Sequence, residues 1–177
     1  MLAPRRSDVD QLNNLARQQR TADGALRGAT LTIEGTSFQR GDRVVTVRND
    51  YHLGVRNGSH ATITKIHSRG GEMTIRLDHG KTRRLSAEYL HGGHIGHGYA
   101  ITIHKAQGIT TDRTYVLGTS DLYRELGYVA LSRGRLSNDI YLTEPTGREH
   151  AHRLEISTVD RTPGLRTSRQ QTLGIDR

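Results

Sequence analysis

The sequence of 177 residues contains no cysteine, no tryptophan and only three prolines. Without cysteine the chain can form no disulfide bond, no cysteine-ligated zinc site and no thiol nucleophile. No apolar run reaches the ~20 residues that a membrane-spanning helix requires, and residues 1–6 lack the apolar stretch of a secretory signal. We therefore expect a soluble protein that has no membrane partner and is located in the cytoplasm.

Basic side chains outnumber acidic ones, with 26 Lys and Arg against 18 Asp and Glu and a formal net charge of +8. Residues 36–93 hold most of this excess, with 10 basic and 5 acidic side chains. An excess of this sign favours a polyanionic partner, of which nucleic acid is the first candidate. The length and a hydrophobic fraction of 33% fit one ordinary domain or two small ones.

The pattern of residues changes along the chain. Residues 36–93 contain four or five short β-prone runs separated by tight turns, which predicts a small antiparallel barrel of the SH3-like type. Residues 94–147 alternate β-prone and helical segments, which favours a parallel sheet, and residues 1–35 would supply its missing strand and helix. The barrel would then be an insertion in a discontinuous α/β domain. Residues 148–177 are predicted to form a flexible tail.

Alternation of apolar residues and helical spacing locate the individual elements. Strands are expected at residues 43–48, 60–67, 73–77, 82–85, 99–103, 114–118 and 139–143, and helices at residues 7–23 and 121–132.

Two short motifs resemble ligand sites but have simpler interpretations. Gly80-Lys81-Thr82 resembles the end of a phosphate loop, yet Ile75 occupies the position where that loop needs its first glycine, so we predict a hairpin turn. The histidines of residues 91–98 recur every third position between glycines, and we expect a flexible hinge there and no metal site.

In two other segments, an apolar run is followed directly by polar or charged side chains. Residues 99–108 read Tyr-Ala-Ile-Thr-Ile-His-Lys-Ala-Gln-Gly, which places polar groups at the carboxyl end of a strand, where open α/β sheets bind ligands. The alternative is an ordinary strand with a solvated end. Residues 128–135 read Tyr-Val-Ala-Leu-Ser-Arg-Gly-Arg, a helical face that ends in two arginines. Those arginines are either a favourable charge at a helix C-terminus or an arginine finger for a γ-phosphate.

In this order, the two segments resemble motifs V and VI of superfamily 1 DNA helicases, in the RecD and TraA branch that includes the helicase part of conjugative relaxases. Residues 2–13 resemble the motif IV region of that branch, and residues 41–58 are similar to its SH3-like 2B insertion. The resemblance implies a partial RecA-like helicase domain 2A of the UvrD-like C-terminal type, formed by residues 1–35 and 94–147, with residues 36–93 inserted as 2B.

The resemblance also implies roles for individual residues. Arg133 would be the catalytic arginine finger. The nucleotide-binding residues would be Gln107, Gly108, Arg135 and Arg6, and the single-stranded DNA contacts would be Thr102, His104 and Lys105. Arg5 is an equal candidate for the motif IV arginine. Where many members carry a glutamate for the ribose, this chain has Ile109-Thr110-Thr111, a departure that leaves ribose recognition unassigned.

The sequence contains no Walker A loop and no Asp-Glu motif for magnesium. In this family both belong to domain 1A, so ATP and Mg²⁺ would be bound only in the complete helicase. We expect the chain alone to hydrolyse no ATP and to need a Walker-containing 1A domain or subunit beside single-stranded DNA. A start inside the motif IV strand indicates a split subunit or a truncated gene.

The alternative functions are a stand-alone basic nucleic-acid-binding module and a helicase remnant without catalysis. Base-stacking side chains would come from the tyrosines, with Tyr51, Tyr89 and Tyr99 as candidates.

Overall fold

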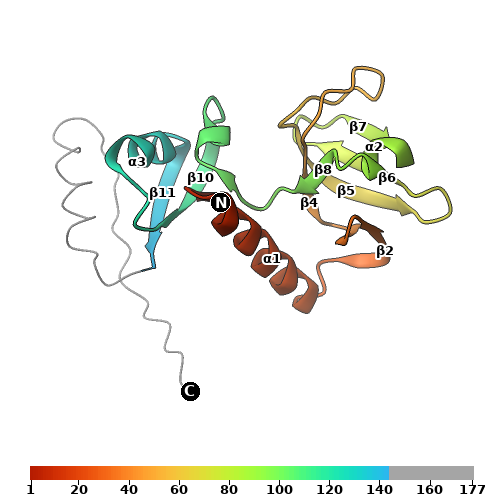
Figure 1. Ribbon diagram of the computed structural model, residues 1–177, viewed down its shortest axis with the longest axis horizontal. Coiled ribbons are helices and arrows are strands. Elements are labelled where there is room, and N and C mark those ends of the chain that lie inside the picture. The colour runs from red at the N-terminus through yellow and green to blue at the C-terminus, as the bar shows by residue number, and fades with distance from the viewer. Residues whose placement is uncertain (144–177) are drawn as a thin grey trace. The chain divides into compact units, whose positions relative to one another are not determined.

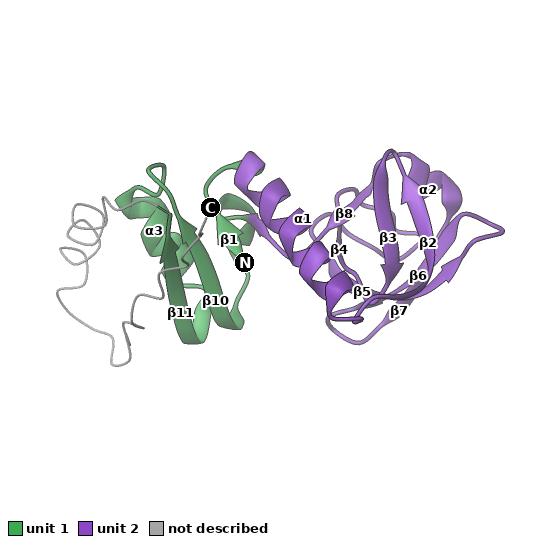
Figure 2. Cartoon of the chain, turned by 90° about the horizontal axis from the view of Figure 1, so that it is seen from below, with its two compact units in different colours: residues 1–6, 102–177 green, residues 7–101 purple. Residues whose placement is uncertain are grey.

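The computed structural model describes residues 1–143, so the tail predicted at residues 148–177 lies outside the described part. The chain divides into two compact units (Figure 2). Unit 1 combines Met1–Arg6 with the chain from Thr102 onward, and unit 2 is Ser7–Ile101. These boundaries differ from the predicted insertion at residues 36–93, and the domain assignment stays a prediction.

Unit 1 is built on a sheet whose strand order is β11-β10-β1-β9. Strand β10 pairs in parallel with both β1 and β11, as the alternation of strands and helices predicted. Helix α3 contacts β10 and β11 (Figure 1). Its apolar stripe buries Leu126 and Ala130. The elements of this unit are β1 (Leu2–Ala3), β9 (Ile101–Thr102), β10 (Thr111–Gly118), α3 (Arg124–Leu131) and β11 (Gly134–Leu142).

Unit 2 contains a five-stranded sheet of order β7-β6-β5-β4-β8, in which every neighbouring pair is antiparallel. A separate hairpin of β2 and β3, the long helix α1 and the short helix α2 complete this unit. Its elements are α1 (Arg6–Ala22), β2 (Arg27–Ile33), β3 (Thr36–Arg40), β4 (Arg43–Thr46), β5 (His60–His67), β6 (Glu72–Leu77), β7 (Thr82–Leu85), α2 (Ala87–His91) and β8 (Ile95–His97).

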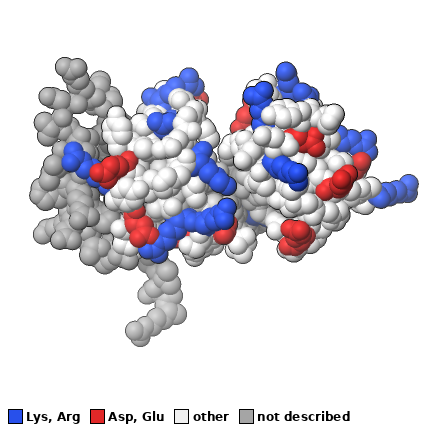
Figure 3. All heavy atoms as spheres, turned by 45° about the horizontal axis from the view of Figure 1, so that its top comes forward, with Lys and Arg blue, Asp and Glu red and all other residues white. Residues whose placement is uncertain are grey.

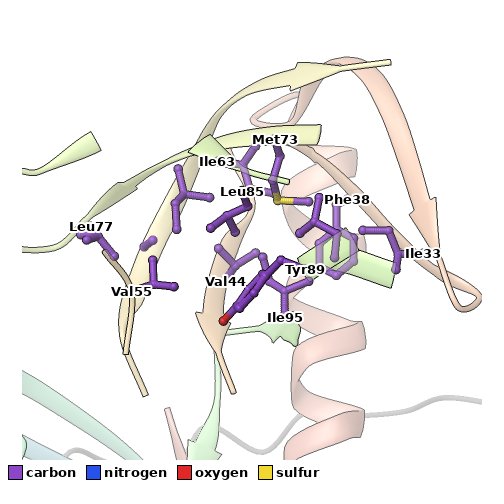
Figure 4. Packing of buried hydrophobic residues seen from close by; sticks show 13 residues of the cluster. Ile33, Phe38, Val44, Val55, Ile63, Met73, Leu77, Leu85, Tyr89 and Ile95 are labelled. Carbon is purple, nitrogen blue, oxygen red and sulfur yellow. The ribbon is translucent and has the colours of Figure 1, made fainter. Parts of the chain in front are cut away.

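The core of unit 2 follows from strand alternation. Ile63 on β5 lies opposite Ile75 on β6, and both are almost completely buried because alternate residues of a strand point to one face. Each such side chain contributes about 1.5 to 3 kcal/mol when it leaves water. The cluster in Figure 4 also contains Phe38, Met73 and Leu85. The hydrophobic face therefore fixes the register of this sheet.

The antiparallel strands agree with the sequence prediction more closely than the loops do. The predicted bounds of β5 and β7 match, and Gly80-Lys81-Thr82 does form the turn into β7. The hinge expected at residues 91–98 is wrong in part, because β8 pairs with β4 there. Gly98 permits this approach, since a Cβ at that position would lie 2.8 Å from the Val44 carbonyl carbon.

Helix α1 is fixed within unit 2 by polar contacts. The buried Asn13 side chain donates to the Ala100 carbonyl at 3.3 Å and accepts the backbone N–H groups of Tyr99 and Ala100 at 3.0 and 2.9 Å. One turn later, Arg17 donates to the carboxylate of Asp42 at 3.4 Å. These hydrogen bonds explain why α1 belongs to unit 2. They give hydrogen-bond partners to buried polar groups that have lost their contacts with water.

Asp42 is completely buried, and its carboxylate accepts three donors. The Tyr99 hydroxyl donates to Asp42 Oδ1 at 2.6 Å, and the Gln39 backbone N–H donates to Oδ2 at 2.7 Å. Burial, followed by the hydrogen bond to Asp42, raises the pKa of Tyr99 to about 12. The protonated phenol is therefore the form that the fold stabilises.

This shift predicts an alkaline loss of stability. Because the folded pKa of Tyr99 lies above the value of 10.0 for an unperturbed tyrosine, its contribution is complete below about pH 10 and disappears as the pH rises towards about 12. Urea unfolding over this range should show the wild type losing more free energy of unfolding than Tyr99→Phe, which has no proton to lose. Equal losses in the two proteins would contradict the assignment.

Candidate nucleotide and nucleic-acid site

The predicted nucleotide-binding residues and DNA-backbone contacts all lie in unit 1, at the end of its first segment or after residue 101, whereas the three candidate stacking tyrosines lie in unit 2. They belong to three stretches: the start of α1, the turn that follows β9, and the junction between α3 and β11. The geometry of each stretch determines which side chains are available.

The predicted DNA contacts sit on one short turn. Strand β9 ends at Thr102, and a 3₁₀ turn, η1, follows at His104–Ala106. Ile103 and Ala106 are buried, which turns His104 and Lys105 outward, where both are exposed. The Thr102 hydroxyl accepts the backbone N–H of Lys105 at 3.3 Å and so stabilises the turn.

The chain then reverses at Gly108, whose φ of +83° lies in the left-handed region that favours glycine. Gln107 beside it is exposed, and the Ile109 N–H donates to the Ala106 carbonyl at 3.0 Å. This reversal brings the chain to the start of β10.

Arg133 lies against that reversal and follows α3. Its guanidinium donates from Nε to the Val129 carbonyl at 2.9 Å, from Nη1 to the Ile109 carbonyl at 3.4 Å and from Nη2 to the Ser132 hydroxyl at 2.7 Å. Its own carbonyl accepts the Thr111 N–H at 2.9 Å. The structure thus brings Arg133 to the residues that directly follow Gly108.

The charge of Arg133 is not compensated locally. Every acceptor of its side-chain hydrogen bonds is neutral, and no carboxylate within residues 1–143 forms an ion pair with it. The side chain is partly buried, so it is fixed yet accessible. A fixed guanidinium of this kind is suited to binding an external phosphate or carboxylate.

The other arginines of the candidate site differ from Arg133. Arg135 is exposed and forms an ion pair with Asp112 at 2.5 Å. Arg5 is paired with Asp121, whereas Arg6 is exposed at the first position of α1. Of the two motif IV candidates, Arg5 therefore already has an anionic partner within unit 1.

Of the tyrosines expected to stack on bases, Tyr89 is a wrong assignment. Its side chain is buried, and its hydroxyl donates to the Arg48 carbonyl at 2.7 Å. Tyr99 is engaged with Asp42, while Tyr51 is 77% exposed. The sequence did not distinguish the three, because the burial of Tyr89 in α2 and the contact of Tyr99 with Asp42 arise from the tertiary structure.

The histidines of the glycine-rich segment make structural contacts. His94 Nε2 lies 2.9 Å from an Arg48 nitrogen, and His97 Nε2 lies 3.2 Å from the Ser37 carbonyl. Burial lowers the pKa of His97. In the described part of the chain, no three or more His, Cys, Asp or Glu side chains are grouped so that they could hold a metal ion.

On the face drawn in Figure 3, Lys and Arg side chains are interspersed with Asp and Glu and do not form one continuous basic surface. None of the helices described in residues 1–143 is long and apolar enough to cross a membrane.

No protein-family model matches this chain. It is 34% identical over 145 residues to the conjugal transfer protein TraA of Rhizobium radiobacter, covering 80% of this chain and 13% of TraA. It is also 32% identical over 114 residues to the ATP-dependent RecD2 DNA helicase of Deinococcus radiodurans, covering 61% of this chain and 15% of RecD2. The chain thus spans about an eighth of the length of the TraA protein.

Among solved structures, the Pif1 helicase from Bacteroides in complex with ADP-AlF3 and single-stranded DNA superposes with a TM-score of 0.59 at 18% identity. The match covers 89% of this chain and 45% of that Pif1 chain, and it establishes a shared fold. By sequence and by fold, this chain is therefore related to superfamily 1 helicases of the RecD and TraA type, and it corresponds to one part of those longer proteins.

Proposed function

We propose that this chain forms one wall of the ATP site and part of the single-stranded DNA path of a superfamily 1 helicase that acts in the cytoplasm. Arg133 is the arginine finger for the γ-phosphate. A Walker-containing 1A domain supplies the opposite wall, with Mg²⁺ bound beside the nucleotide. The observation that carries the proposal is the partly buried Arg133 guanidinium, which no described carboxylate compensates.

The hydrogen bonds of Arg133 support this role. Carbonyl and hydroxyl partners hold the planar guanidinium in one orientation without cancelling its charge. A charge oriented before the reaction stabilises the transition state without the cost of reorganising, and an arginine finger accelerates phosphoryl transfer by about 10³- to 10⁵-fold.

We assign further residues to the nucleotide-binding side. Gln107 and Gly108 lie in the stretch directly before Ile109, whose carbonyl accepts from Arg133, and Arg6 contributes a further exposed cation. Arg135 can contact the nucleotide only when its ion pair with Asp112 is broken. ATP supplies the reacting phosphoryl group when it is bound.

We further assign the two sheets to helicase domains. The parallel strands β1, β10 and β11, covered by α3, belong to a RecA-like domain 2A formed by residues 1–35 and 94–147. The antiparallel strands within residues 36–93 belong to an SH3-like 2B barrel. The Pif1 fold match supports this assignment.

Thr102, His104 and Lys105 bind the phosphate backbone of single-stranded DNA. We expect His104→Ala to weaken binding of a fluorescein-labelled oligo(dT) strand by about 10- to 150-fold, since a hydrogen bond to a charged group contributes about 1.5 to 3 kcal/mol. Fluorescence anisotropy of the full chain measures this affinity. His79→Ala is the matched control, because His79 is an exposed histidine of unit 2.

A second candidate function is a stand-alone nucleic-acid-binding module. It is favoured by the charge of residues 7–101, which hold 13 basic and nine acidic side chains. Both functions predict affinity that falls with salt, because bound phosphates release counterions. Unchanged DNA binding by His104→Ala would favour the module and contradict the motif V assignment.

A further inference from the structure

The loop at residues 49–58, which joins β4 to β5, presents an aromatic ring to solvent. Tyr51 near its tip is 77% exposed, the largest value among the exposed large hydrophobic side chains of residues 1–143. Exposure on this scale leaves the apolar ring in water, and nothing in the packing of unit 2 requires a tyrosine at this position. We refer to residues 49–58 as the Tyr51 loop.

The Tyr51 loop is held in one conformation. Asp50 and Val55 exchange backbone hydrogen bonds of 2.9 Å in both directions, and the Gly54 N–H donates to the Tyr51 carbonyl at 3.2 Å. The Asp50 carboxylate accepts the Leu53 N–H at 2.9 Å, and the Val55 side chain is buried in the core. Binding a ligand on Tyr51 would therefore order little additional backbone.

Arginines accompany the exposed ring. Arg83 on β7 lies against the loop, where its Nε donates to the Gly54 carbonyl at 3.3 Å and leaves no room for a Cβ on Gly54. Arg48 directly precedes the loop in the sequence, and Arg56 lies within it. Within residues 1–143, none of these three arginines forms an ion pair with a carboxylate.

We propose that the Tyr51 loop is a second single-strand contact, in which the Tyr51 ring stacks on an unpaired base while Arg83 and Arg56 contact the flanking phosphates. An exposed aromatic ring on a loop that also carries or contacts uncompensated cations is a combination that binds single strands without reading their sequence. The inference rests on the nucleic-acid partner of the proposed function, but it concerns unit 2, whereas Thr102, His104 and Lys105 belong to unit 1.

The test compares two labelled strands, oligo(dT) and an abasic strand of equal length that keeps the phosphates but has no bases. For the full chain, Tyr51→Ala should weaken oligo(dT) binding by about 5- to 100-fold, and Tyr51→Trp should preserve it, because stacking needs only an aromatic face. On the abasic strand, wild type and Tyr51→Ala should bind equally. Arg56→Gln should weaken both strands and reduce the salt slope by about 0.7.

Tyr141→Ala is the control, since Tyr141 is 58% exposed and lies in unit 1, and it should bind oligo(dT) like wild type. Thermal unfolding of each variant checks that the fold is retained. If Tyr51→Ala binds oligo(dT) like wild type while His104→Ala does not, the stacking inference is overturned and the proposed function stands. If Tyr51→Ala weakens both strands equally, the ring does not stack on bases and the inference also fails.

Discussion

Replacing Arg133 by alanine is expected to lower kcat for DNA-stimulated ATP hydrolysis by about 10³- to 10⁵-fold when this chain is combined with a Walker-containing 1A domain. The loss follows from removing a cation that stabilises the charge of the transferring γ-phosphate. Arg133→Lys should recover only part of the rate, because an ammonium lacks the planar fork that the Val129 and Ile109 carbonyls orient. Phosphate release measured with saturating oligo(dT) provides the readout.

Two comparisons isolate this effect from a general loss of structure. Arg133→Ala should bind oligo(dT) like wild type, because the proposed DNA contacts lie on the turn of Thr102 and η1. Arg124→Ala, at an exposed position in α3 of the same unit, should retain the rate. If the purified chain alone hydrolysed ATP with Mg²⁺ and lost that activity on Arg133→Ala, the proposal of a shared site would be refuted.

The largest expected effect on stability comes from Asp42→Ala, which should lower the free energy of unfolding of unit 2 by about 3 to 5 kcal/mol. Asp42 is completely buried, and its loss removes the carboxylate that accepts from the Tyr99 hydroxyl, the Gln39 N–H and Arg17 Nε. Urea unfolding followed by circular dichroism measures the change. The effect should exceed that of Tyr99→Phe, which removes one donor and costs about 1 to 3 kcal/mol.

Asp42→Asn separates charge from shape, because the amide keeps the volume of the side chain but loses the negative charge opposite Arg17. We expect a loss between those of Tyr99→Phe and Asp42→Ala. A loss below about 1 kcal/mol for Asp42→Ala would mean that water replaces the carboxylate, and the contact between α1 and the antiparallel sheet would then contribute little.

Strands β5, β6 and β7 of unit 2 were predictable because each carries local information. Apolar side chains alternate along β5 and β6, and glycine-containing turns separate them. Strand β8 carries no such pattern, since its short Ile-Gly-His sequence is ordered by the backbone of β4. The hairpin of β2 and β3 was missed because most of β2 is exposed and offers no hydrophobic period.

In unit 1 the length of each strand depended on pairing with a neighbouring strand as well as on its own sequence pattern. Strand β11 begins five residues before the predicted start at residue 139, because its polar first half pairs with β10. The segment predicted as a strand at residues 99–103 forms only the short β9, since the chain then winds into η1. Pairing with a neighbour extends a strand beyond its own propensity, and local turns shorten it.

The sequence by itself determined the basic charge, the absence of thiol chemistry, the alternating strands of the antiparallel sheet, and the two motif-bearing segments around Gly108 and Arg133. These properties reside in composition or in residues close together along the chain. Only the tertiary structure decided which arginines keep an uncompensated charge. Arg135 forms an ion pair with Asp112, and Arg5 forms one with Asp121, although each pair is far apart in the sequence. Arg133 donates only to neutral oxygens. Such pairings depend on how distant segments fold together, so no local pattern encodes them.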